Sequence, residues 1–174
     1  WIRPRDEAVG AFYMGKSNWW HIVDTDEDEN REAYSPTHSM WIGDESKGNG
    51  EYRSGWDYSI YTSDSYSLGA ADELSFKHYY DTESSTYPYD GGNVQISTDG
   101  GENWVVIHPE ENNGSYPADS VIGLGNEPGY HGNSDGWVDA TFDLSNFSGE
   151  DVIFRFRFGS DSVVATYEGW YFDD

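Results

Sequence analysis

The strongest constraint on the fold is a period-two alternation of apolar and polar residues in three segments, 74–80, 137–144 and 152–158. The last segment places four apolar residues on one face and two arginines on the other: Val152, Phe154, Phe156 and Phe158 against Arg155 and Arg157. Successive side chains of a β-strand point to opposite faces of the sheet, so each segment buries one face and exposes the other to solvent. This alternation predicts antiparallel strands packed as a β-sandwich.

Shorter apolar runs between turn-rich clusters complete the set of expected strands: 19–23, 39–42, 57–62, 93–97, 104–108 and 170–172. No longer stretch has the spacing of an amphipathic helix. We therefore expect an all-β fold, a single antiparallel jelly-roll-type β-sandwich with long polar loops such as 110–136. Residues 1–17 are expected to form a lead-in segment and 18–174 the sandwich. The expected core includes these residues: Phe76, Val94, Ile96, Phe142, Phe154 and Phe156.

Acidic residues outnumber basic ones by 33 to 9, and the formal net charge is −24. A field of this sign repels nucleic-acid phosphates and anionic membrane surfaces, so neither is an expected partner. No apolar run reaches the length of about 18 residues that spans a bilayer, so we expect no membrane insertion. The 14 Tyr and 8 Trp residues argue against a disordered chain. Two explanations of the acidity stay open: a salt-adapted surface, or carboxylates that bind divalent cations.

The sequence lacks the motifs of the common hydrolases. Its five histidines include no His-Glu-x-x-His pair, and there is no Gly-x-Ser-x-Gly turn to carry a catalytic serine. The chain has no cysteine, which excludes disulfides and thiolate metal sites. His21 and His78 lie within aromatic runs and are expected to be hydrogen-bonded core or rim residues. We therefore expect no catalytic activity in this chain.

The segment 97–104, Ser-Thr-Asp-Gly-Gly-Glu-Asn-Trp, has the composition of a tight β-hairpin. Its Asp-Gly-Gly centre supplies the positive φ angles that such turns need. Asp99 can accept hydrogen bonds from the amides of the turn, and Trp104 can pack back over the hairpin. The spacing resembles the Asp-box hairpin of sialidase propellers and other secreted β proteins, which implies a structural role for Asp99.

Several acidic residues lie at the expected strand ends: Asp81, Glu83, Asp90, Glu168, Asp173 and Asp174. Calcium takes about six to eight oxygen ligands, which loops gathered at one end of a sandwich can supply. Without a cation, the same carboxylates would repel one another and raise the free energy of the folded state. We therefore expect calcium as a stabilising cofactor, with a solvated acidic surface as the alternative.

Five segments in order along the chain carry a family resemblance: 74–83, 89–104, 136–138, 154–161 (Phe-Arg-Phe-Arg-Phe-Gly-Ser-Asp) and 167–174. Together with 20–23 and 38–43, they resemble the MAM-like β-sandwich of immune inhibitor A, a family of secreted metallopeptidases. The resemblance implies a jelly-roll-type sandwich, a non-catalytic role, a secreted or cell-surface location, and calcium near the paired acids and the final strand. The peptidase's zinc motif has no match here, so we expect a fragment of a larger extracellular protein.

Three functions are compatible with these observations. The leading one is an accessory module that stabilises, positions or targets a neighbouring extracellular domain. The first alternative is a carbohydrate-binding module, in which loop aromatics stack on sugars and arginines bond to hydroxyls: Tyr52, Trp56, Tyr87, Tyr116, Tyr130, Arg155 and Arg157. The second alternative is a structural subunit of an extracellular assembly, in which strands pair between copies.

Overall fold

The computed structural model describes residues 12–13, 19–26, 31–47, 50–83, 87–110, 114–163 and 166–174. Its strands in chain order are β1 (Phe12–Tyr13), β2 (Trp20–Asp24), β3 (His38–Ile42), β4 (Asp57–Thr62), β5 (Tyr66–Ser67), β6 (Glu73–Asp81), β7 (Gly91–Ser97), β8 (Val105–Val106), β9 (Ala118–Val121), β10 (Glu127–Gly129), β11 (Val138–Asp143), β12 (Asp151–Gly159) and β13 (Gly169–Asp173). Two short 3₁₀ helices, η1 (Ile122–Leu124) and η2 (Ser145–Phe147), lie between strands. Within the described residues, neither the length nor the apolarity of any helix would suit a membrane span.

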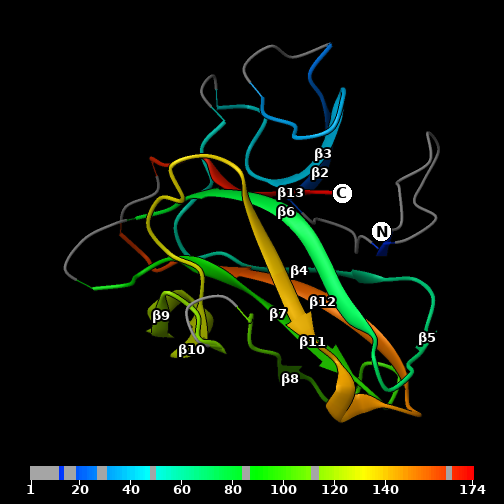
Figure 1. Ribbon diagram of the computed structural model, residues 1–174. Helices are drawn as coiled ribbons and strands as arrows, with labels where there is room; N and C mark the ends of the chain where they lie inside the picture. Colours follow the sequence, from blue (N-terminus) through cyan, green and yellow to red (C-terminus); the bar gives the residue numbers. More distant parts are fainter. Residues whose placement is uncertain are drawn as a thin grey trace.

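Two antiparallel sheets form the body of the molecule (Figure 1). One has the order β1-β4-β12-β7-β8, with β5 also paired to β12, and the other has the order β11-β6-β13-β3-β2. The expected all-β antiparallel sandwich is confirmed, and each expected strand has an observed counterpart whose bounds differ by no more than two residues. β1 lies within the expected lead-in segment and pairs with β4.

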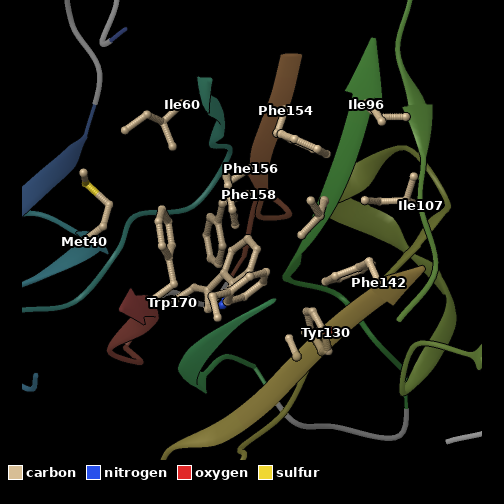
Figure 2. Packing of buried hydrophobic residues seen from close by; sticks show 14 of the residues in the cluster. Met40, Ile60, Ile96, Ile107, Tyr130, Phe142, Phe154, Phe156, Phe158 and Trp170 are labelled. Carbon is tan, nitrogen blue, oxygen red and sulfur yellow. The ribbon is translucent and has the colours of Figure 1, made fainter. Parts of the chain in front are cut away.

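The core lies where the apolar faces of the two sheets meet (Figure 2). Phe156 of β12 and Phe172 of β13 stack with ring centroids 4.3 Å apart. Trp170 lies beside both, with centroid distances of 5.9 and 6.1 Å. The residues expected in the core are all buried: Phe76, Val94, Ile96, Phe142, Phe154 and Phe156. These large rings contribute much of the hydrophobic stabilisation, because each removes a large apolar area from water.

A hairpin of β9 and β10 lies within 110–136, which we expected to be a loop. It covers the outer face of β7, where the Asn93 side-chain amide donates to the Pro128 carbonyl at 2.9 Å and to the Glu127 carboxylate at 3.2 Å. Gly91 permits this close approach, because a Cβ there would lie 2.2 Å from the Tyr130 carbonyl oxygen. The sequence pattern did not indicate the hairpin because its strands are short and one consists of Glu-Pro-Gly.

Candidate metal site

Three carboxylates meet at one end of the sandwich, those of Glu83, Asp90 and Asp161. Glu83 follows β6, Asp90 precedes β7 and Asp161 follows β12. β7 and β12 pair with Gly91 opposite Gly159, so the start of one strand lies beside the end of the other. One oxygen of each carboxylate lies within 4.8 Å of the other two. Because β6 belongs to the second sheet, the cluster connects the two sheets.

Tyr52 lies against this cluster and is fully buried. Its hydroxyl donates to Oδ2 of Asp90 at 2.6 Å and accepts from the Glu83 backbone N–H at 3.1 Å. The backbone N–H of Asp161 donates to Oδ1 of Asp90 at 2.7 Å. The Tyr52 ring packs edge-on against Phe158 of the core, with centroids 5.0 Å apart. The packed core therefore fixes the position of the buried carboxylate.

The cluster is electrostatically unfavourable without a cation. Burial raises the pKa of Asp90 to about 6, although its hydrogen bonds from Tyr52 and Asp161 act in the opposite direction. Burial and the charge of Asp161 also raise the pKa of Glu83. Oε2 of Glu83 is buried with no hydrogen-bond partner among the described residues. No ion pair found in the described part of the chain involves these three carboxylates.

The chemistry of the cluster fits calcium. Oxygens that each lie about 2.4 Å from a common ion can be at most about 4.8 Å apart, which the three carboxylates satisfy. Carboxylate oxygens are hard ligands, and each oxygen of Asp90 that accepts one hydrogen bond keeps a further lone pair. The unpartnered Oε2 of Glu83 would gain a partner in such an ion. Glu83, Asp90 and Asp161 would therefore hold the cation.

Asp81 and Glu168 lie outside this cluster, although we expected them to share a site with Glu83 and Asp90. They are neighbours across β6 and β13, where Gly169 pairs with Asp81. Oδ1 of Asp81 accepts a hydrogen bond from the Asn133 side-chain amide at 2.9 Å. Burial, followed by the charges of Asp81 and Glu32, raises the pKa of Glu168. These two acids form a separate pair.

Asp173 has a structural role at the far end of β13, remote from Glu168. It is buried, and its carboxylate accepts the backbone N–H groups of Tyr34 and Ser35 at 2.9 and 2.7 Å. The Ser35 hydroxyl donates to it at 3.0 Å. A five-residue strand separates its two ends by more than about 13 Å, so Asp173 and Asp174 cannot share an ion with Glu168. The expectation that all the terminal acids converge was wrong for this geometric reason.

Four of the five aromatic residues expected to be exposed in loops are buried: Tyr52, Trp56, Tyr116 and Tyr130. The polar loops that carry them fold back onto the sheets, because the folded chain has a lower free energy when these large apolar rings are buried than when they remain in water. The hydroxyl of Tyr116, for example, donates to the Ile107 carbonyl and accepts the Val94 N–H. Tyr87 alone of the five is exposed, at 62%.

The two arginines on the outer face of β12 both have protein partners. Arg157 forms a bidentate ion pair with Asp57, at 2.8 and 2.9 Å, and a further bond to Glu127 at 2.8 Å. Arg155 lies 4.4 Å from the centre of the Trp104 ring and donates to the Gln95 side-chain carbonyl. These contacts hold the sheet face to the hairpins that cover it.

The hairpin at 97–104 has the structural role expected of it. Asp99 accepts the Asn103 backbone N–H at 2.9 Å, the Asn103 side-chain amide at 2.7 Å and the Ser97 hydroxyl at 2.8 Å. Gly100 and Gly101 have φ angles of 71° and 94°, which only glycine adopts without strain. The Trp104 ring lies over Gly101 as well as over Arg155.

Asp99→Asn is expected to lower the Tm at neutral pH. The hydrogen bonds from Asn103 hold the pKa of Asp99 at about 2, below its ordinary value of 3.8. This stabilisation is therefore present above about pH 4 and is lost as the pH falls towards 2. Calorimetry between about pH 6 and pH 2 should show the Tm values of wild type and variant converging. A difference that stays constant with pH would contradict the assignment.

Most of the chain matches the model of a known protein family. The family model for the MAM domain of immune inhibitor A-like proteins matches residues 47–174. The pre-pro-metalloprotease PrtV of two Vibrio cholerae strains is 49% identical over 47 residues, which is 27% of this chain and only 5% of PrtV.

Two solved structures are similar to this chain at TM-scores below 0.5. The K2 adhesin domain of Lys-gingipain has a TM-score of 0.47 at 16% identity, over 92% of this chain and 86% of that one. A protein from a study of carbohydrate-binding modules of the β-sandwich superfamily has a TM-score of 0.48 at 12% identity, over 97% and 57%. The family match covers most of the chain, including all three members of the carboxylate cluster. The chain therefore belongs to the immune inhibitor A-like MAM domain family.

Proposed function

We propose that this chain is a calcium-stabilised, non-catalytic accessory and interaction module of a secreted peptidase or cell-surface protein. The observation that carries the proposal is the cluster of Glu83, Asp90 and Asp161. Carboxylate oxygens from loops of both sheets lie within 4.8 Å of one another there. Family membership supports attachment to a larger extracellular protein, since the matched relative PrtV is described as a pre-pro-metalloprotease. The partners of the module are then the domains next to it in that protein.

Calcium would act as a cross-link between the sheets. Glu83 leaves β6 of one sheet, while Asp90 and Asp161 flank β7 and β12 of the other. An ion held by all three carboxylates removes their mutual repulsion and gives the buried Oε2 of Glu83 a partner. The ligand loops are far apart in the unfolded chain, so the ion binds the folded state preferentially.

We expect calcium to raise the Tm more than magnesium at matched ionic strength, relative to EDTA. A cation bound only by the folded chain adds about 2.7 kcal/mol to the free energy of unfolding at a hundredfold excess over the Kd. Magnesium should have less effect, because it demands a tighter octahedral site and gives up its water reluctantly. Matched ionic strength removes the general screening of a chain with net charge −24.

Matched variants distinguish calcium binding at this site from a general effect of the acidic surface on the Tm. Asp161→Asn should abolish most of the calcium response, while its backbone N–H still donates to Asp90. Glu73→Gln removes the same charge from an exposed position on β6 and should leave the response intact. Asp173→Asn should also leave it intact, because Asp173 bonds to Tyr34 and Ser35 instead. Equal responses to the two cations, unaffected by Asp161→Asn, would show that the acids are only a salt-adapted surface.

A further inference from the structure

A second feature of the molecule is an open pocket of about 540 Å³ beside the hairpin of β9 and β10. Three parts of the chain line it: residues 87–88 before β7, the hairpin of β9 and β10 together with η1, and His131. The side chains that line it include those of Tyr87, Asp119, Ser120, Ile122, Asn126 and His131. None of the carboxylates of the candidate metal site lines it.

Two exposed hydrophobic side chains line this pocket. Tyr87 is 62% exposed and Ile122 is 46% exposed. They are two of the five large hydrophobic residues that are exposed in the described part of the chain, and both lie here. The Tyr87 ring is placed edge-on to Tyr89, with centroids 6.2 Å apart. An exposed ring held in this way offers a flat face for an apolar surface of a ligand.

Polar groups line the same pocket. Asp119 is exposed, and its carboxylate has no cationic partner among the described residues. Asn126 has a φ of 71°, and its side-chain carbonyl lies 3.5 Å from the Ser120 hydroxyl. Nδ1 of His131 is buried without a hydrogen-bond partner among the described residues. The pocket therefore combines a carboxylate, an amide, a hydroxyl and an imidazole with an aromatic face.

We infer that this pocket binds a neutral sugar unit of a glycan. A pyranose ring has an apolar C–H face that can lie on Tyr87 and hydroxyls that can bond to Asp119 and Asn126. Polar groups that bond to a ligand hydroxyl give the strongest discrimination against ligands that lack it.

The charge of the site argues for a neutral ligand. Asp119 is the one ionised group in the lining, and the chain as a whole carries −24, so anionic glycans are repelled. Burial lowers the pKa of His131, so its imidazole is neutral at neutral pH and offers no positive charge to an acid. A neutral hexose or N-acetylated hexose meets no such penalty.

The two sites share one segment of the chain. Tyr87 lies between Glu83 and Asp90, and its neighbours Pro88 and Tyr89 accept the N–H groups of Ile122 and Gly123 at 3.0 and 2.7 Å. The candidate ligand Asp90 follows Tyr87 by three residues in the sequence. The inference rests on the proposed role as an interaction module and does not require the calcium site.

The test is binding of the whole chain to an array of neutral and acidic glycans, followed by calorimetric titration of the best neutral ligand. We expect binding to neutral glycans, and we expect Tyr87→Ala to weaken it by at least about tenfold. Asp119→Asn should weaken it too, because a carboxylate accepts stronger hydrogen bonds than an amide. Tyr34→Ala is the matched control, since it removes a tyrosine that is 50% exposed elsewhere and should have no effect.

The inference is overturned if no neutral glycan binds, if only acidic glycans bind, or if Tyr87→Ala leaves binding unchanged. A proline-rich decapeptide is the competing probe, and peptide binding lost with Tyr87→Ala in the absence of glycan binding would identify a peptide groove instead. The glycan site and the calcium site can be contradicted independently of each other. Tyr87→Ala should keep the calcium-induced rise in Tm, and glycan binding through Tyr87 without any calcium response would remove the metal site alone.

Discussion

Phe156→Ala is expected to lower the free energy of unfolding by about 3–5 kcal/mol. The ring is 3% exposed and contacts Phe172, Phe76 and Trp170, with centroid distances of 4.3, 5.3 and 5.9 Å. Truncation removes these contacts and leaves a cavity between the sheets that neighbouring rings can fill only in part.

Denaturant unfolding with a two-state fit measures this effect. Val105→Ala is the control, because Val105 lies on β8 at 57% exposure and should change stability by no more than about 0.5 kcal/mol. Both variants should keep the same dependence on denaturant, since the surface exposed by unfolding hardly changes. A loss below about 1 kcal/mol for Phe156→Ala would mean that the sheets do not pack around this ring.

In the absence of calcium, the protein is expected to lose stability as the pH rises from about 4 to about 6. The pKa of Asp90 is about 6 in the folded chain and has its ordinary value of 3.8 when unfolded, so the folded state binds more protons across this range. A difference of about two pKa units corresponds to roughly 3 kcal/mol, which is lost as Asp90 ionises inside the protein. The loss is complete above about pH 6.

The informative quantity is the difference in slope between wild type and Asp90→Asn. General repulsion among the acids also varies with pH, but it is nearly the same in both proteins. Asp90→Asn should flatten the fall between about pH 4 and pH 6, whereas Glu73→Gln should not. With saturating calcium the wild-type slope should reverse, because the ion binds the ionised carboxylates. Identical slopes in wild type and Asp90→Asn would contradict the burial of an ionisable carboxyl group at this position.

The sequence by itself determined those features that depend on residues close to one another along the chain. The alternation around Phe154 and Phe156 predicted both a strand and the face it buries, because side-chain direction in a strand follows from position alone. The turn at Asp99 could be assigned for the same reason, since its hydrogen bonds reach no further than Asn103. Two of the three carboxylates of the candidate metal site, Glu83 and Asp90, were likewise among the acids singled out at strand ends.

Only the tertiary structure decided which acids meet and which aromatics are buried. Asp161 was not among the expected ligands, since only the pairing of Gly91 with Gly159 brings it beside Asp90. Glu168 and Asp173 were expected to lie together at the end of the last strand, yet β13 places them at opposite ends. Such proximities depend on strand register and on how loops fold back over the sheets. Both arise from the summed packing of residues far apart in the chain, so no local pattern encodes them.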